Sequence, residues 1–289
     1  MKLHDGELDI SADLVRGLLR RQFPRWAALS LTPVAAAGTD NVMFQLGEDL
    51  VIRLPRMPGS VATILKENRW LPWLAPQLPL AIPSPVGLGE PGEGYPLPWS
   101  ISRWLPGNHD ISDLSGAATA LGDFVAALQR VEVVNDAPPA YRGGSYASWD
   151  DGVRAALRDL DVPGASHAWE AALRLPAWGG PPVWLHSDLL PPNLLAAGGQ
   201  LHAVIDFGCA GVGDPACDLM PAWTVFDETT RPLFRARLTV DDASWERGRA
   251  WALAFGLAAW HYYEERNPPF AALGRRTVNQ TLTNTASST

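Results

Sequence analysis

The sequence has only two cysteines, Cys209 and Cys217, among its 289 residues. A disulfide-rich extracellular scaffold needs several paired cysteines, so the composition argues against that class of protein. No apolar run reaches the roughly 18 to 20 residues that a membrane-spanning helix requires. The first 15 residues carry acidic side chains where a secretion signal needs apolar ones. We therefore expect a cytoplasmic protein with no part in a membrane.

An excess of positive charge is also missing, because the formal net charge is −8. Residues 1–106 contain ten basic and ten acidic residues, whereas residues 107–289 contain 13 basic and 21 acidic ones, so the whole excess lies in the second part. Nucleic acids require a basic surface, and we expect no nucleic-acid partner. An acidic second part is compatible with a cationic small molecule, and equally with acidic side chains that only aid solubility.

The apolar pattern predicts a strand-rich part at the start of the chain. Ser11 is suited to cap a helix over residues 12–22. Three short strands follow between residues 28 and 55. A helix over residues 59–74 and a strand that ends at residues 106–107 complete this part. We place the domain boundary there, between a first lobe over 1–106 and a second lobe over 107–289.

The second lobe is predicted to be mainly helical. Its helices are expected over about 112–131, 148–160, 166–174, 214–227, 229–236 and 242–266. The last residues, 279–289, are polar and rich in threonine and serine, and we expect them to fray. The predicted fold class is α+β, with a small antiparallel-sheet lobe and a larger helical lobe. A ligand is expected in a cleft between the lobes.

Two short apolar strands in the second lobe each run into polar side chains. The first is followed by His186, Asp188 and Asn193, in the sequence VWLHSDLLPPNLL. The second ends at Asp206, in LHAVIDFG. Carboxylate and amide oxygens are the ligands that Mg²⁺ prefers. The spacing H-x-D-L-x-x-x-N, with D-F-G beginning 13 residues after the asparagine, matches the catalytic and metal-binding loops of kinases.

In that arrangement Asp188 accepts the proton of a substrate hydroxyl, and Asn193 and Asp206 hold Mg²⁺ on the nucleotide phosphates. His186 is expected to brace the loop without reacting. The alternative is a purely structural loop in which these polar residues form a turn and helix caps. That alternative leaves the pairing of the two carboxylates unexplained.

These segments resemble the aminoglycoside phosphotransferase family, whose members have a protein-kinase-like fold. The resemblance is carried by LHSDLLPPNLL and by VIDFGCAGVGDPACDLMPAW, extends over about residues 10–280, and is most specific over 183–223. Ser187 stands where the family more often has glycine. The resemblance implies a two-lobed enzyme that transfers phosphate from ATP, with Mg²⁺, to an alcohol group.

The first lobe lacks the G-x-G-x-x-G loop of protein kinases and has AAGTDNVMF in its place. The backbone N–H groups of Gly38, Thr39, Asp40 and Asn41 are candidates to approach a nucleotide phosphate. A plain hairpin turn explains the same four residues. Both interpretations remain open at this point.

Arg53, in LVIRLP, occupies the place of the usual phosphate-binding lysine, and an arginine is able to grip phosphate with two donors. Glu67 on the following helix is its expected partner. Lys66 on the same turn competes with this assignment, and two unrelated surface charges are the alternative to an Arg53–Glu67 pair. The segment that includes Ser102 and Trp104 corresponds by order to the interlobe hinge, whose backbone would bind the adenine edge of ATP. GTP is an alternative nucleotide.

Asp214 and Asp218 lie downstream in GDPACD. The resemblance implies that they brace the active-site loops. A helix N-cap is an equally good account of Asp214. We assign neither residue to catalysis.

The prediction is an ATP- and Mg²⁺-dependent O-phosphotransferase that acts on a small molecule, either as a monomer or as a homodimer. The resemblance implies an antibiotic of the aminoglycoside type, so that the enzyme would confer resistance. Alternatives are a macrolide or nucleoside antibiotic, a choline- or homoserine-type metabolite, or a non-enzymatic pseudokinase. The acidic residues that form the pool of candidate contacts for a cationic substrate are Asp150, Asp151, Asp227, Glu228, Glu264 and Glu265.

Overall fold

The computed structural model describes residues 7–34 and 41–283, and its contacts divide the chain into two compact units. The first unit comprises residues 1–107 together with 203–208, and the second comprises 108–202 and 209–289. The boundary predicted from the sequence, between residues 106 and 107, assigns residues 203–208 to the second lobe. Their contacts instead place them with the first unit, because the chain returns to it after the motif loop.

The first unit is built on one antiparallel sheet of five strands. Its spatial order is β1-β2-β3-β5-β4. The strands are β1 (Leu31–Pro33), β2 (Asn41–Leu46), β3 (Leu50–Pro55), β4 (Pro85–Gly89) and β5 (Trp99–Arg103). Strand β4 was not predicted, because its two glycines and proline carry little strand propensity and pairing with β5 decides its conformation.

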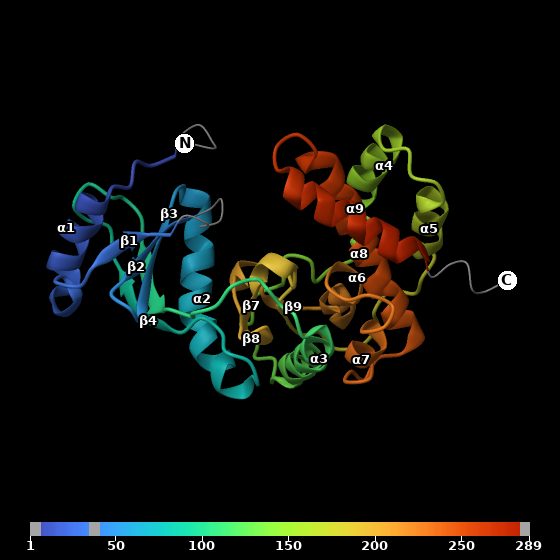
Figure 1. Ribbon diagram of the computed structural model, residues 1–289, viewed down its shortest axis with the longest axis horizontal. Coiled ribbons are helices and arrows are strands. Elements are labelled where there is room, and N and C mark those ends of the chain that lie inside the picture. Colours follow the sequence, from blue (N-terminus) through green and yellow to red (C-terminus); the bar gives the residue numbers. More distant parts are fainter. Residues whose placement is uncertain (1–6, 35–40, 284–289) are drawn as a thin grey trace. The chain divides into compact units, whose positions relative to one another are not determined.

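Two helices flank this sheet, α1 (Ala12–Gln22) and α2 (Val61–Leu74), and Figure 1 shows the sheet between them. The Ser11 side chain accepts the N–H of Leu14 and so caps α1 as predicted. The core of the unit packs apolar side chains of α1 against the sheet, including Leu18, Ile52 and the fully buried Trp99. The predicted helix over 59–74 is present, with a single 3₁₀ turn before Val61.

The second unit is mainly helical. Its helices are α3 (Leu114–Arg130), α4 (Asp150–Asp159), α5 (Ala165–Ala172), α6 (Pro221–Thr224), α7 (Arg231–Arg235), α8 (Asp242–Tyr263) and α9 (Pro268–Leu282). Two strand pairs interrupt them. Strand β6 (Val183–Leu185) pairs antiparallel with β9 (Gly211–Gly213), and β7 (Leu194–Ala197) pairs with β8 (Gln200–Val204).

Two predictions in this unit were wrong, one of a helix and one of a frayed end. The segment predicted as one helix over 214–227 is a 3₁₀ turn followed by the short α6, because Pro215 and Pro221 supply no N–H group. Part of the segment expected to fray belongs to α9, which packs beside α8 (Figure 1). There the hydroxyl groups of Thr277 and Thr281 donate to backbone carbonyls of their own helix, so these buried threonines are satisfied.

The remaining predicted helices are present, with boundaries that shift by a few residues. Within residues 7–34 and 41–283, no helix is both long and apolar enough to cross a membrane.

Candidate active site

The loop between β6 and β7 is anchored by a buried carboxylate. The backbone N–H groups of His186 and Ser187 donate to the two oxygens of Asp218, each at 2.7 Å. The imidazole of His186 is fully buried, and its Nδ1 accepts the N–H of Asp188 at 3.2 Å. His186 and Asp218 therefore hold the backbone of the loop, in agreement with the bracing interpretation.

Burial raises the pKa of Asp218 to about 7, and this effect exceeds that of the two N–H donors, which lower the pKa. The negative charge of Asp188 adds to the upward shift. Asp218 has no arginine or lysine partner among the interactions of the described residues. Its carboxyl group consequently titrates close to neutral pH.

Asp188 is positioned by Asn193, five residues further along the loop. The Nδ2 of Asn193 donates to the backbone carbonyl of Asp188 at 2.8 Å and to its Oδ2 at 3.0 Å. The side chain of Asp188 remains 19% exposed, in contrast to the fully buried His186 and Ser187 beside it. The structure therefore brings together two predicted site residues and leaves the candidate base accessible.

Arg142 is a neighbour of Asp188 that the sequence did not indicate. Its Nη1 donates to Asp188 Oδ1 at 2.5 Å and to the carbonyl of Ser187 at 2.9 Å. The backbone N–H of Arg142 donates in turn to Ser187 Oγ at 2.9 Å. Burial is the largest single influence on the pKa of Arg142 and lowers it, but the charge and hydrogen bond of Asp188, together with the two nearby cysteines, outweigh burial and the net shift is upward. The guanidinium is therefore a permanent cation beside the candidate base.

The segment before Arg142 runs along β9 and extends the β6–β9 sheet. Pro139 forms a parallel bridge with Val212, and two backbone hydrogen bonds join residues 138 and 140 to Val212. Gly213 makes this approach possible, because a Cβ at that position would lie 2.3 Å from the carbonyl oxygen of Gly143. The two glycines of GVG, just after the second motif, thus serve to dock the segment that carries Arg142.

In the first unit, Arg53 and Glu67 form the predicted ion pair. Nη1 of Arg53, on β3, lies 2.5 Å from Oε2 of Glu67, on α2. Burial raises the pKa of Glu67, Arg53 lowers it, and the nearby charge of Asp206 raises it. Oε1 of Glu67 and Nε of Arg53 have no hydrogen-bond partner among the described residues. The pair is therefore buried and incompletely satisfied.

Asp206 lies two residues after the end of β8 and has a backbone φ of 64°, in the left-handed region that few side chains adopt. Its negative charge contributes to the raised pKa of Glu67, so the two carboxylates of the first unit interact electrostatically. Ser187 has a similar φ of 68°. Both motif strands thus end in a sharp turn that changes the direction of the chain at a polar residue.

The predicted nucleotide contacts are only partly described. Gly38, Thr39 and Asp40 lie outside the described residues, and Asn41 begins β2 with a buried side chain. Ser102 is buried in β5, paired with Val51. The N–H of Trp104 donates to the carbonyl of Asp49 at 2.7 Å, so this N–H group is already engaged and is not free for a base.

Asp214 acts as a cap, and its carboxylate also forms a buried ion pair. Its Oδ1 accepts the N–H of Ala216 and caps the following 3₁₀ turn. Its carboxylate also pairs with the buried Arg247, with Nε 2.9 Å from Oδ2. The residue is thus fully engaged in holding α8 to the loop after β9.

The six acidic residues proposed for a cationic substrate are less available than the sequence indicated. Asp150 accepts hydrogen bonds from Arg154 and Trp169. Asp227 accepts several from Thr229 and Thr230, which lower its pKa strongly. Glu264 pairs with Arg275 at 3.0 Å. The other three side chains, Asp151, Glu228 and Glu265, are exposed.

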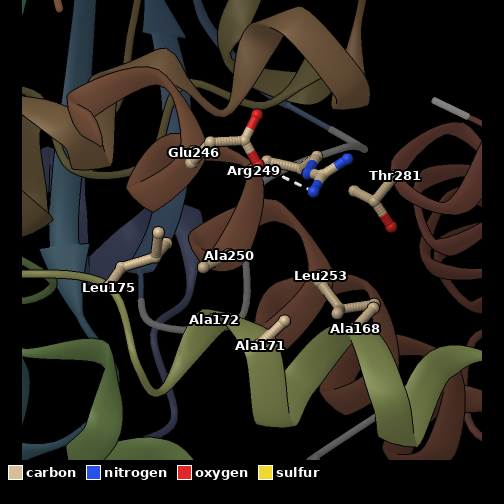
Figure 2. Close-up of a pocket in the computed structure, with 9 residues that line it drawn as sticks. All are labelled: Ala168, Ala171, Ala172, Leu175, Glu246, Arg249, Ala250, Leu253 and Thr281. Carbon is tan, nitrogen blue, oxygen red and sulfur yellow. Dashed lines mark ion pairs between the residues drawn. The ribbon is translucent and has the colours of Figure 1, made fainter. Parts of the chain in front are cut away.

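A small pocket in the second unit contains none of these residues. It lies between α5, α8 and α9, with the Glu246–Arg249 ion pair at its edge (Figure 2). Its volume of about 60 Å³ has room for only about two water molecules. It is too small for a sugar ring or a nucleotide, so it is not the candidate site.

Comparisons with known proteins place this chain in a family. A family model described as the phosphotransferase enzyme family (APH) matches residues 30–251. The sequence matches no curated protein.

Solved structures of similar fold include APH(2'')-IIIa with GDP and kanamycin, at 18% identity and a TM-score of 0.68, covering 93% of this chain and 98% of that one. The APH(4)-Ia complex with AMP-PNP and hygromycin B is 20% identical, with a TM-score of 0.65 and coverage of 96% and 100%. The macrolide 2'-phosphotransferase MphH from Brachybacterium faecium is 22% identical, with a TM-score of 0.59 and coverage of 92% and 97%.

These likenesses confirm the predicted α+β, protein-kinase-like fold class. The family match spans both motif loops and the strand that carries Arg53. The chain belongs to the phosphotransferase enzyme family, the aminoglycoside phosphotransferase (APH) family that its motifs resemble.

Proposed function

We propose that this protein is an ATP- and Mg²⁺-dependent O-phosphotransferase that phosphorylates a hydroxyl group of a small-molecule antibiotic, with GTP as an alternative donor. The observation that carries the proposal is the state of Asp188. Its carboxylate is held on both oxygens, by Arg142 and Asn193, and yet is partly exposed on a braced loop. A general base requires this combination of fixed geometry and access.

In the proposed reaction, Asp188 accepts the proton of the acceptor hydroxyl as that oxygen attacks the γ-phosphorus. The new oxygen–phosphorus bond forms while the bond to the β–γ bridging oxygen breaks, and the nucleoside diphosphate leaves. Such a transfer depends on positioning and charge neutralisation more than on covalent catalysis. The Asp188 side chain supplies the positioning on the acceptor side.

Asn193 and Asp206 are the residues that would hold Mg²⁺. Across the described part of the chain, no three histidine, cysteine or acidic side chains converge closely enough to form a metal site by themselves. That finding fits Mg²⁺ bound with nucleotide phosphates, which needs only one or two protein ligands.

The side-chain NH₂ group of Asn193 donates to Asp188, so the side-chain oxygen of Asn193 is the atom suited to a metal. The neighbouring charges of Asp206 and Glu67 in the first unit likewise favour a bound cation. When bound, the metal neutralises charge on the phosphates.

We assign Arg53 to the nucleotide phosphates and Glu67 to its orientation. Arg53 carries a fixed charge, and one edge of its guanidinium is held by Glu67 at 2.5 Å. Nε of Arg53 is buried without a hydrogen-bond partner among the described residues, but the side chain as a whole is 13% exposed, so the guanidinium is partly accessible to an anion. Phosphate contacts by residues 38–40 remain a prediction.

The acceptor class is the least constrained part of the proposal. An aminoglycoside is the first candidate, because the excess negative charge lies in residues 107–289. A macrolide is the second, because three of the six candidate acids bind their own neighbours and a macrolide phosphotransferase shares the fold at 22% identity.

The test is formation of nucleoside diphosphate with Mg²⁺ and either ATP or GTP, against kanamycin, gentamicin, streptomycin, hygromycin B and a macrolide, with choline and homoserine as metabolite controls. Asp188→Asn is the blank, since the amide keeps the shape but cannot accept the proton. We expect its kcat to fall by about 10²–10⁴-fold in protein that remains folded. Equal turnover by the two proteins would refute the assignment of Asp188 as base.

A further inference from the structure

We propose that Arg142 is a positioning residue, which fixes the carboxylate of Asp188 for proton acceptance. This inference rests on the proposed phosphotransferase function. It concerns a residue outside both sequence motifs, 46 positions before the aspartate that it contacts.

The hydrogen bonds given for Arg142 are all made to the loop that carries the candidate base. One nitrogen, Nη1, donates both to Asp188 Oδ1 at 2.5 Å and to the carbonyl of Ser187 at 2.9 Å. Asn193 holds the other carboxylate oxygen at 3.0 Å. Each carboxylate oxygen of Asp188 therefore accepts a hydrogen bond from a different side chain, and these two bonds oppose rotation of the carboxylate.

The guanidinium itself is held in place by aromatic rings. Its central carbon lies 5.3 Å from the ring centre of Tyr141, 5.4 Å from that of Trp149 and 6.0 Å from that of Phe255. Rings at these distances attract a cation and restrict its movement. The Arg142 side chain is only 12% exposed, and its backbone is fixed by the strand-like pairing along β9. A rigid support of this kind is what a precisely placed reactive group requires.

A purely structural role is the competing explanation. Arg142 also supports Ser187, whose φ of 68° is unusual, so removal of the arginine is expected to lower stability in either case. The two explanations differ in kcat. A structural arginine affects the amount of folded protein, whereas a positioning arginine changes the turnover of the protein that is folded.

The experiment compares Arg142→Met, Arg142→Lys and wild type, first in slow hydrolysis of MgATP, in which water is the acceptor, and then with any antibiotic turned over by wild type. We expect Arg142→Met to lower kcat by about 10–100-fold with the nucleotide KM within about twofold, because a displacement of about 1 Å can cost 100-fold. Lysine has three donors and is expected to restore part of kcat, since it can reach the same two oxygens.

Arg231→Met is the matched control. Arg231 is also largely enclosed, in the second unit, and donates to the carbonyl of Ala222 and to Gln280, away from the motif loops. The same chemical change there is expected to lower the melting temperature and leave kcat unchanged. A wild-type kcat in folded Arg142→Met, or a loss of kcat in Arg231→Met as large as in Arg142→Met, would overturn the proposal.

A crystal structure of Arg142→Met provides a readout that needs no turnover. We expect the Asp188 carboxylate to leave its 3.0 Å contact with Asn193 or to occupy two rotamers. An unmoved carboxylate overturns the inference about Arg142. If wild type turns over no acceptor and no nucleotide above the Asp188→Asn blank, the proposed function fails, and the position of this carboxylate still decides what Arg142 does.

Discussion

Each of the two units contains an arginine–carboxylate pair with the same contact distance, and the two pairs differ in burial. Arg53–Glu67 in the first unit and Arg142–Asp188 in the second both have Nη1 2.5 Å from a carboxylate oxygen. The exposed fraction of the carboxylate side chain is 3% for Glu67 and 19% for Asp188. Burial makes the first carboxylate a support for its arginine. Because Asp188 is partly exposed, it is able to contact a substrate, and Arg142 is the residue that supports it.

The first prediction is that the loss of the arginine costs more stability in the buried pair. Arg53→Met leaves Glu67 buried without a partner and is expected to lower the free energy of unfolding by about 3–5 kcal/mol. Arg142→Met leaves Asp188 accessible to water and is expected to cost only about 1–2 kcal/mol. Urea unfolding of the two variants measures the difference, and equal losses would show that burial does not separate the pairs.

The double variant Arg53→Met with Glu67→Leu serves as the control for this prediction. Replacement of both partners by apolar side chains removes the buried charge, so most of the lost stability is expected to return. The nucleotide KM is expected to stay raised in both variants, because the cation assigned to the phosphates is gone. Recovery of nucleotide affinity in the double variant would contradict that assignment.

Asp218 extends the comparison to a carboxylate that is buried without an arginine. Its pKa of about 7 exceeds the value of about 4 in an unfolded chain, so the folded state binds this proton more tightly. The stabilisation is complete below pH 4 and is lost as the pH rises to about 7, by at most about 4 kcal/mol. Asp218→Asn cannot titrate, so its unfolding free energy is expected to lack this decline.

The measurement is chemical unfolding of wild type and Asp218→Asn between pH 4 and pH 7.5. The difference between the two curves isolates Asp218 from the other titrating groups. The asparagine variant is expected to be less stable overall at pH 4, because its amide group opposes one of the two backbone N–H donors. Parallel curves would mean that Asp218 keeps an ordinary pKa.

A smaller effect is expected when the segment that carries Arg142 is pushed outward. Gly213→Ala places a methyl group 2.3 Å from a backbone oxygen of Gly143, so the segment must shift, at a cost of about 1–3 kcal/mol. Because Arg142 moves with it, kcat is expected to fall as well. Gly144→Ala is the matched control, since nothing lies within 4 Å of its new Cβ. Equal unfolding and kinetic behaviour of the two variants would contradict the docking role of Gly213.

The smallest effect is expected from an exposed pair of the same chemistry. Glu264 and Arg275 lie 3.0 Å apart, and both side chains are about half exposed, at 50% and 51%. Glu264→Gln is expected to change stability by less than about 1 kcal/mol and the KM for any antibiotic turned over by wild type by less than about fivefold. Steady-state kinetics with increasing salt checks this, and a large, salt-sensitive rise in KM would restore Glu264 as a substrate contact.

Contacts between residues that lie near one another in the sequence were predicted more successfully than contacts between distant segments. The Arg53–Glu67 pair joins a strand to the next helix, 14 residues away, so local pattern and family resemblance were sufficient to predict it. The motif residues His186, Asp188 and Asn193 were found for the same reason, because they lie in one short loop. The helix predicted over 214–227 was wrong although the segment is local. Its prolines divide it into a 3₁₀ turn and the short α6, and the prediction did not take them into account.

The features that were missed depend on contacts between distant segments. Strand β4 exists because β5 pairs with it, and α9 exists because its threonines and small side chains pack on α8. The return of residues 203–208 to the first unit is a property of the chain path. Propensity and periodicity carry no information about such partners, so these elements were predicted poorly or not at all.

By itself, the sequence determined the two-part α+β organisation, the two motif loops and the membership of a phosphotransferase family. Each of these depends on apolar periodicity and on residues within about 20 positions of one another. Three properties required the folded chain: the ion pair of Arg142 with Asp188, the pKa of Asp218 near 7, and the hydrogen bonds and ion pairs of several surface acids. Burial and the proximity of charges set these properties, and both arise only when segments far apart in the chain are packed together.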